Sequence, residues 1–328
     1  MYSIILESLQ YSLKYTIKIV PIVTIGIFVA NFLINTGIMK KLDKLIKPIA
    51  SRANISAIST LAVATCTFSS TAGFSMLSEG LNEKKVSEKE VIATTLISSF
   101  PSILSHLFTF FIPFVIPILG VITGTIYIFL RVVIALLKSI IGIILAKIWL
   151  KTKVMDAQDN ANKRLANPNH YIVPTTPTYT QISKKSLKST YKVLKRIVIV
   201  MVIALFVISI LDKLGAFENF KNIFEPISNT FGFKSEIVIV SATEILDTRA
   251  GFIVAGDFLN KNILNTTDVL IALLLGNIIS FSTRFVKHSL PLHVSLFGYK
   301  LGTKIVMINA ITTLLIDVLF IAILIGLF

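Results

Sequence analysis

The hydrophobic positions of the chain form long runs that polar residues interrupt only at intervals. A helix needs about 20 consecutive, mostly apolar residues to cross a bilayer. Runs of this kind predict six membrane-spanning helices joined by polar or proline-containing turns. We expect these spans at Ile17–Ile38, Ser87–Phe111, Leu119–Trp149, Ile197–Leu214, from near Thr267 onward, and at Leu301–Leu327.

Two segments between these runs are less hydrophobic and have a polar centre. Residues Ile55–Leu81 are interrupted at Thr65–Thr71, and residues Ile237–Leu259 at Glu244–Arg249. Irregular backbone is tolerated at membrane depth only where it is buried in protein or lines a cavity. We therefore predict that both segments, 55–81 and 237–259, are re-entrant hairpins that enter the membrane without crossing it.

The helix that follows each hairpin has a recognisable start. Ser87 and Glu90 have the spacing of a capping box, in which each side chain bonds to the backbone amide of the other residue. The counterpart in the second half begins near Thr267 and Asp268, which places an acid in the first turn. Both starts predict a helix directly after the hairpin.

The same order of hydrophobic and polar segments occurs twice along the chain. When the sequence is shifted along itself so that Gly120 falls on Gly298, Ala72–Phe74 falls on Ala250–Phe252 without any gap. Glycine matches are informative because glycine occupies positions where the backbone bends or packs closely. Internal repeats of this size are typical of secondary transporters.

Charge places equivalent turns on opposite sides of the membrane. The turn 109–126 contains no charged residue, whereas its counterpart, 287–304, carries three lysines. Because positively charged loops stay on the cytoplasmic side, the two halves are predicted to be inverted relative to each other. Each half then has three spans, an interfacial helix (Met39–Ala50 or Phe217–Ser228) and a re-entrant hairpin, and both termini lie outside.

The predicted fold is thus an all-α polytopic membrane protein with an inverted internal repeat. We expect residues 1–150 to form the first repeat and residues 186–328 the second. Residues 151–185, which are polar and contain several prolines, are expected to be a cytoplasmic linker.

Composition supports a membrane protein. Hydrophobic residues make up 54% of the chain and charged residues 15%. Soluble proteins usually carry about 25% charged residues. The single cysteine, Cys66, excludes a disulfide scaffold.

The net charge of +15 is concentrated between Lys151 and Arg196. This placement indicates a loop beside a membrane and not a nucleic-acid-binding face. We expect a multi-pass protein of the cell membrane whose partners are the lipid bilayer and a small molecule or ion; a homo-oligomer is compatible with this.

The amino-acid sequence of the hairpins and of the helices that follow them resembles that of a known superfamily. The residues that carry the resemblance are Thr65–Phe74 and Leu96–Ser102, with counterparts at Glu244–Phe252 and Gly276–Ser280. The order of elements is similar to the transport core of concentrative nucleoside transporters and to the wider nucleoside-recognition, or Gate, superfamily. The resemblance implies a substrate pocket made by the hairpin tips and the unwound middles of the following helices, with a sodium site near the first hairpin.

Candidate substrate-binding residues follow from the resemblance and from the cost of burying charge. A charge at mid-membrane costs about 2.5–3.5 kcal/mol, so charged residues in a hairpin tip indicate function or internal pairing. The alternative for Asp247 and Arg249 is an ion pair that locks the tip, and for Asn277 it is a hydrogen bond between helices. The candidates are Glu244, Asp247, Arg249, Asn277, Ser280, Thr67 and Ser69.

Hydroxyl groups near the first hairpin are candidates for holding a small cation, because they and freed carbonyls are oxygen ligands. The alternative is that they only satisfy the broken backbone. The candidates are Ser70, Thr71, Ser98, Ser99 and Ser102. Elsewhere, Arg131 and Lys138 share one face of a long span, and either could contact Asp317 across the bundle; for Lys138 we favour extension toward the membrane surface or packing at a helix interface.

These observations favour a secondary transporter of a small polar solute, nucleoside-like in character and coupled to Na⁺ or H⁺ by alternating access. Two alternatives stay open: a Gate-type metal-ion permease similar to ferrous-iron permeases, and a membrane assembly or regulatory protein that does not transport. No arrangement of catalytic residues points to an enzyme. We expect no cofactor other than Na⁺ and no bound structural metal.

Overall fold

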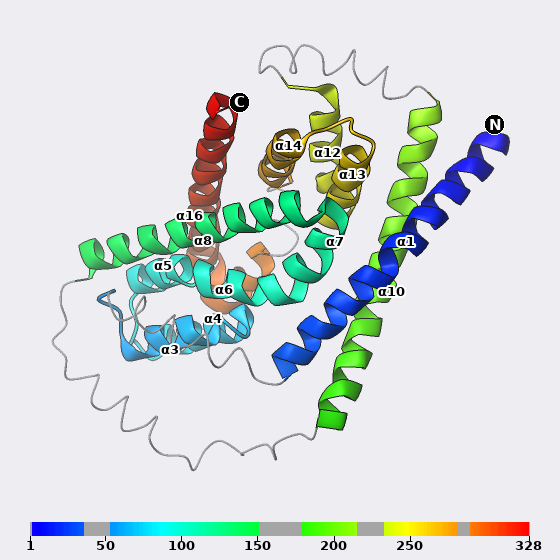
Figure 1. Ribbon diagram of the computed structural model, residues 1–328. Helices are drawn as coiled ribbons and strands as arrows, with labels where there is room; N and C mark the ends of the chain where they lie inside the picture. Colours follow the sequence, from blue (N-terminus) through cyan, green and yellow to red (C-terminus); the bar gives the residue numbers. More distant parts are fainter. Residues whose placement is uncertain (1, 36–52, 151–178, 215–232, 281–288, 328) are drawn as a thin grey trace.

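The computed structural model describes residues 2–35, 53–150, 179–214, 233–280 and 289–327, and no strand occurs among them (Figure 1). In the first half the helices are α1 (Tyr2–Asn35), α3 (Ala57–Thr65), α4 (Ser70–Asn82), α5 (Glu88–Ile97), α6 (Ser99–His106), the π-helix η1 (Leu107–Val115), α7 (Ile116–Leu119) and α8 (Val121–Trp149). In the second half they are α10 (Tyr179–Lys213), α12 (Ser235–Leu246), α13 (Thr248–Asn260), α14 (Thr266–Ile279) and α16 (Leu290–Leu327).

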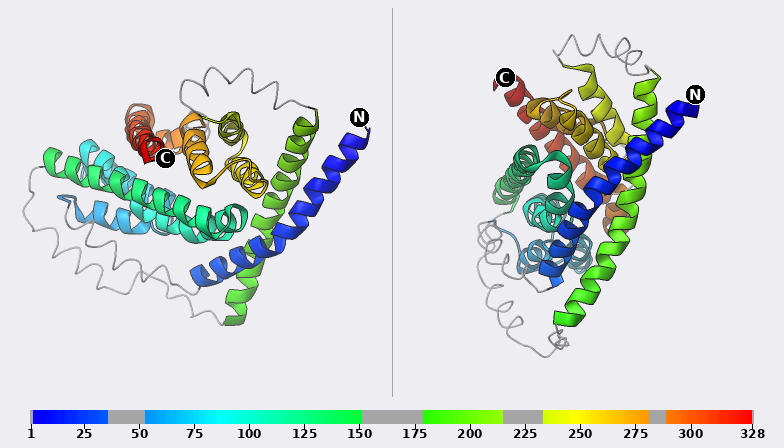
Figure 2. Two further views of the ribbon diagram at one scale, coloured as in Figure 1. Left: turned by 45° about the horizontal axis from the view of Figure 1, so that its top comes forward. Right: turned by 45° about the vertical axis from the view of Figure 1, so that its right-hand side comes forward.

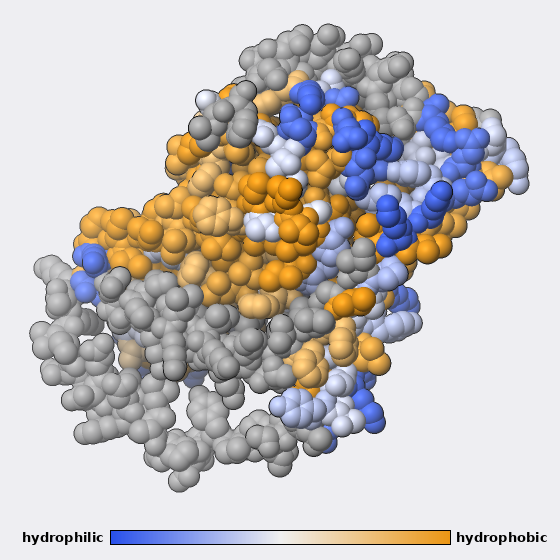
Figure 3. Space-filling view, viewed as in Figure 1, coloured by the Kyte–Doolittle hydropathy of each residue, from blue (hydrophilic) through white to orange (hydrophobic). Residues whose placement is uncertain are grey.

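Three stretches of the described residues are helical, long and apolar enough to cross a membrane: Glu88–Leu119, Val121–Trp149 and Leu290–Gly326. Shorter apolar helices lie at Ile197–Leu211 and Thr266–Ile279. Hydrophobic residues form a continuous patch over α8 in Figure 3, and hydrophilic residues gather toward the ends of α1 and α10. The chain is an integral membrane protein built from helices.

Some of the sequence predictions fall on residues that the structure leaves undescribed. The interfacial helices expected at 39–50 and 217–228 lie outside the described residues, as does most of the linker. The last residues of the expected linker belong to α10, which begins at Tyr179. The first expected span, from Ile17, lies in α1 as far as Asn35.

Helix pairs occupy both segments in which hairpins are expected. In the first pair, a Cβ atom on Gly80 would touch Ile58, and one on Gly73 would lie 2.7 Å from the carbonyl oxygen of Ala62. Because a later residue of α4 contacts an earlier residue of α3, the two helices run antiparallel. The break between them lies at residues 66–69, and Asp247 alone separates α12 from α13. Both breaks fall in the predicted polar centres.

Backbone geometry recurs at the repeat spacing found in the sequence. Gly120 has φ 78° and ψ 169°, and its counterpart Gly298 has φ 76° and ψ 166°. This positive-φ conformation, which only glycine adopts without strain, starts α8 and kinks α16. Lys84 and Asn262, which follow α4 and α13, both have φ 56°. The two halves therefore bend at corresponding residues.

The long helices α1 and α10 are counterparts under the same shift and lie side by side at one edge of the molecule in both views of Figure 2. The side-chain amide of Asn31 donates to the Thr190 hydroxyl at 3.1 Å, and Lys213 pairs with Glu7. Since early residues of α1 meet late residues of α10, the pair is antiparallel.

Candidate functional site

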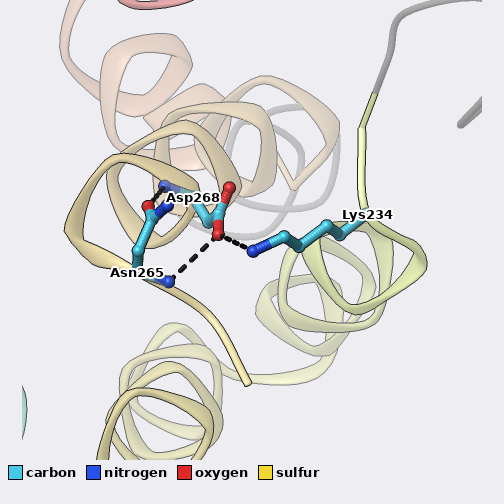
Figure 4. A network of polar contacts seen from close by, with 3 residues as sticks. All are labelled: Lys234, Asn265 and Asp268. Carbon is cyan, nitrogen blue, oxygen red and sulfur yellow. Dashed lines mark hydrogen bonds and ion pairs between the residues drawn. The ribbon is translucent and has the colours of Figure 1, made fainter. Parts of the chain in front are cut away.

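Each hairpin is tied to the first turn of the helix that follows it. In the second half, Asp268 and Asn265 form a complete capping box, with N···O distances of 3.0 and 2.8 Å (Figure 4). The same Asp268 carboxylate lies 2.6 Å from the ammonium group of Lys234, the residue directly before α12. The cap thus also fixes the start of the hairpin.

The first half uses its acid differently. Ser87 accepts a hydrogen bond from the amide of Glu90, as the capping-box prediction requires, but the Glu90 carboxylate binds elsewhere. It accepts from the amide of Ser56 at 2.6 Å and from the hydroxyl of Ser59 at 2.7 Å, at the start of α3. Because Ser56 corresponds to Lys234 under the repeat, both halves anchor the same point of the hairpin on the same helical turn.

The helix after the first hairpin breaks at Ser98, and the helix after the second hairpin ends at Ile279. Between α5 and α6, the Ser139 hydroxyl of α8 donates to the carbonyl of Ile97 at 2.7 Å and accepts from the amide of Phe100 at 3.0 Å. A side chain therefore satisfies backbone groups that the break at Ser98 frees, as buried polar groups require. In the second half, α14 ends at Ile279, and the described chain stops after the buried residue Ser280.

A cavity of about 300 Å³ lies beside the break at Ser98 and the last turn of α14. Its volume is at the lower end of the range of small-molecule sites, about 300–1,000 Å³. The lining comes from α4, α5, α6 and α8 of the first half and from α14 and α16 of the second, so neither half forms the cavity alone. The lining residues are Phe74, Thr95, Ser98, Ser99, Ser102, Lys138, Asn277, Ser289, His293, Val306, Asn309 and Thr313.

The cavity wall is rich in neutral hydrogen-bonding groups. It presents hydroxyls from both halves and two amides, Asn277 and Asn309, each of which offers donors and an acceptor. Phe74 and His293 add an aromatic surface, with ring centroids 5.1 Å apart. Among the described residues of the wall, Lys138 is the one permanent charge and none is a carboxylate. This wall suits a polar organic molecule with a flat ring.

A buried charged cluster lies directly behind the wall. The amide of Asn277 donates to the carboxylate of Asp317, which is 1% exposed. The guanidinium of Arg131 lies 3.8 Å from the same carboxylate. The contact across the bundle that the sequence allowed for Arg131 is therefore present. Lys138, expected at the membrane surface or at a helix interface, instead lines the cavity.

Glu244 is buried deeply, at 3% exposure, beside this cluster. Two glycines make room for its side chain: a Cβ on Gly251 would lie 2.3 Å from its Cγ, and one on Gly276 would lie 2.8 Å from its Cδ. Gly276 directly precedes Asn277, and Glu244 lies within electrostatic range of Arg131. The carboxylate thus supports the wall from behind and does not line the cavity.

The tip of the second hairpin is internally paired. Asp247 caps α13 by accepting from the amide of Arg249 at 2.7 Å, and the two side chains lie 3.9 Å apart. The Arg249 guanidinium also lies 5.9 Å from the ring centre of Phe110. This is the ion pair within the tip that the sequence offered as the alternative to a substrate-binding role for Asp247 and Arg249. The counterpart of Asp247, Ser69, caps α4 by accepting from the amide of Ala72 at 3.2 Å.

The predicted site residues separate into two groups. Ser98, Ser99, Ser102 and Asn277 line the cavity. The hydroxyl of Ser70 lies 3.0 Å from that of Ser102, next to the wall. The others lie around the tips or behind the wall: Glu244, Asp247, Arg249, Ser280, Thr67, Ser69 and Thr71. Among the described residues, no group of three or more His, Cys, Asp or Glu side chains could hold a metal ion.

Several wall residues escaped the sequence reasoning. Thr95 lies one helical turn before Ser98, and Asn309 is the counterpart of Arg131 under the repeat, so both carried a usable signal. Lys138 was marked by its charge inside a long apolar span, but its place in the wall, like that of His293, depends on how the helices pack.

Comparisons with known proteins give one family model and three similar proteins. The family model described as "Nucleoside recognition", the Gate domain, matches residues 16–126. An uncharacterised protein of Methanocaldococcus jannaschii is 44% identical over 97% of the chain and 96% of its own length. Two further uncharacterised proteins of the same organism are 32% and 27% identical, over 96% and 97% of the chain and 99% and 97% of their own lengths. No solved structure matches the chain.

Proposed function

The chain belongs to the nucleoside-recognition, or Gate, family of membrane proteins, and from this premise we propose that it is a secondary transporter of a small polar, nucleoside-like solute. The observation that carries the proposal is the cavity at the broken helices. Transporters with internal repeats bind their substrates near the membrane midplane, where discontinuous helices of the two repeats meet. Ser98 and Ser99 at one break and Asn277 near the other line a single cavity.

We propose that the two repeats are inverted in the membrane. The antiparallel pairing of α1 with its counterpart α10 supports this, because a two-fold axis in the membrane plane reverses the direction of equivalent helices. The α3–α4 and α12–α13 pairs are then the re-entrant hairpins of a six-span protein of the cell membrane. The termini lie outside, and the linker is cytoplasmic.

Transport against the gradient of the solute needs a second, driving gradient, and we propose Na⁺ or H⁺. For Na⁺, the oxygen pair of Ser70 and Ser102 joins the first hairpin to the broken helix beside the wall. For H⁺, the buried carboxylates of Asp317 and Glu244 lie behind Asn277. A divalent metal is a poorer candidate for the cavity itself, because the described part of the wall contains a lysine and no carboxylate.

The test is uptake of radiolabelled uridine by proteoliposomes under an inward Na⁺ or H⁺ gradient. Asn277→Ala removes a wall amide, so we expect uptake to fall at least about tenfold, since a site built to hydrogen-bond loses strongly when a partner is missing. Asn82→Ala, which removes an exposed amide at the end of α4 away from the cavity wall, is the matched control. Unchanged uptake in Asn277→Ala, or uptake by the wild type no greater than by empty liposomes, would contradict the proposal.

A further inference from the structure

Lys138 lies deep along α8 and faces the cavity. Trp149, the last residue of the helix, is about 11 residues further on, which is about 16 Å along the helix axis. A lysine can extend along a helix to reach the membrane surface only when it lies near the helix end. Lys138 is too far from that end, and its side chain instead forms part of the cavity wall.

The ammonium group has no counter-charge in the wall. The described lining contains no Asp or Glu, and Lys138 forms no ion pair with any described residue. The carboxylate near it, Asp317, attracts Lys138 electrostatically but is already bound by Asn277 and lies 3.8 Å from the guanidinium of Arg131. A buried charge without a partner at contact distance is costly, so the cavity favours an occupant that brings a negative charge next to Lys138.

Other wall groups favour the same chemistry. Ser99 and Ser102 present hydroxyl groups from α6, which can donate hydrogen bonds to an anion. Phe74 and His293 come from different helices and pack against each other in the wall, with ring centroids 5.1 Å apart. The wall therefore combines an aromatic surface, neutral hydrogen-bonding groups and one cation.

We infer that the transported solute carries an anionic group, a phosphate or a carboxylate, on an aromatic or nucleoside-like body, and that Lys138 is its counter-charge. The inference rests on the proposed function and narrows its substrate class from polar to anionic. Lys138 is the one charged side chain that the described wall presents to the cavity, so it selects the sign of the solute.

The experiment measures binding to the purified protein by titration calorimetry at neutral pH with two matched pairs of probes. Uridine 5′-monophosphate is compared with uridine, and nicotinate with nicotinamide, so that each pair differs in an anionic group. We expect the anionic member of at least one pair to bind more tightly. In Lys138→Met this preference falls about 10- to 100-fold, the value of a hydrogen bond to a charged group, while affinity for the neutral member stays within about twofold.

Controls separate charge from folding. Lys138→Arg keeps the positive charge and is expected to keep the preference. Lys147→Met removes an exposed lysine of the same helix that does not line the cavity and is expected to behave as the wild type. Size-exclusion profiles and thermal unfolding without ligand identify any variant that fails to fold. If Lys138→Met fails, the probe pairs on the wild type and on Lys138→Arg still decide whether the cavity prefers an anionic solute.

The outcomes distinguish the inference from the proposed function. If the wild type binds uridine and nicotinamide as tightly as their anionic counterparts or more tightly, the inference of an anionic substrate is overturned and the transporter proposal stands. Equal loss of neutral and anionic members in folded Lys138→Met also overturns it, because Lys138 then does not read charge. Absence of binding by all four probes contradicts both proposals.

Discussion

Glu244 and Cys66 occupy equivalent places in the two halves of the chain, each at the end of the first hairpin helix and against a glycine of the second. A Cβ on Gly251 would lie 2.3 Å from the Cγ of Glu244, and one on Gly73 would lie 2.4 Å from the Sγ of Cys66. One half therefore buries a carboxylate where the other buries a thiol. The backbone repeats, but the chemistry beside the cavity is asymmetric.

Gly276→Ala tests whether the wall depends on the space that glycine leaves for Glu244. The new Cβ would lie 2.8 Å from the Cδ of Glu244, so the carboxyl group must move. We expect the variant to lose about 1–3 kcal/mol of stability, as overpacked cores do, measured by unfolding in detergent. Glu244→Ala should recover part of that loss, because the two sites are in contact. Gly326→Ala is the control, because Gly326 has open space around it. An equal loss of stability in Gly276→Ala and Gly326→Ala would contradict the packing argument.

Asp317→Leu tests the buried charged cluster. The substitution leaves the guanidinium of Arg131 buried beside an apolar side chain, and breaking a buried pair in this way costs about 3–5 kcal/mol. Replacing both partners, as Arg131→Met with Asp317→Leu, should be much less destabilising than Asp317→Leu alone. Thermal unfolding of Asp317→Leu, of Arg131→Met and of the double variant measures this, and simple additivity would show that the two charges do not interact.

Glu90→Ala tests the anchoring of the first hairpin. It removes the acceptor of two hydrogen bonds at the start of α3, from Ser56 and Ser59. We expect a loss of about 1–3 kcal/mol, because buried donors are left unsatisfied, and faster hydrogen exchange in the first turn of α3. Glu88→Ala removes an exposed acid from the same helical turn and should have little effect on that exchange. Similar exchange in both variants would count against the anchor.

The antiparallel pairing of α1 and α10 is tested by cysteine cross-linking in a Cys66→Ser background. Cysteines at Asn31 and Thr190, whose side-chain amide and hydroxyl are 3.1 Å apart, should be joined by a short bifunctional thiol reagent. Cysteines at Glu7 and Thr190 should not, because Glu7 lies beside Lys213, at the other end of α10. The opposite result would mean that the equivalent helices are parallel and would remove the main support for inversion.

The parts of the fold that depend on local rules could be predicted from the sequence. Ser69 and Asp247 are residue types that cap helices, and each begins the second helix of a pair inside the predicted polar centre. The partner of Glu90 could not be predicted. A capping box competes with a longer-range contact, and here the carboxylate binds Ser59 of the hairpin in preference to the cap.

The candidate site could also be predicted only in part, because local sequence marks some of its residues and helix packing decides the others. Ser98, Ser102 and Asn277 are polar residues inside apolar helices, which marks them without knowledge of packing, and all three line the cavity. Lys138 and His293 also line it, but their place depends on the rotation of α8 and α16 about their axes. Sequence periodicity does not fix that rotation in helices that are apolar on most faces.

Alternating access is the central claim, and it can be tested without knowing the solute. In a Cys66→Ser background, Ser99→Cys places one thiol in the cavity wall. A membrane-impermeant thiol reagent applied from either side of reconstituted vesicles is expected to label it, because a transporter opens the cavity to each side in turn. A cysteine at Lys147, exposed near the end of α8, should be labelled from one side only. Labelling of Ser99→Cys from both sides is the predicted result; labelling from one side alone, or from neither, would contradict the account.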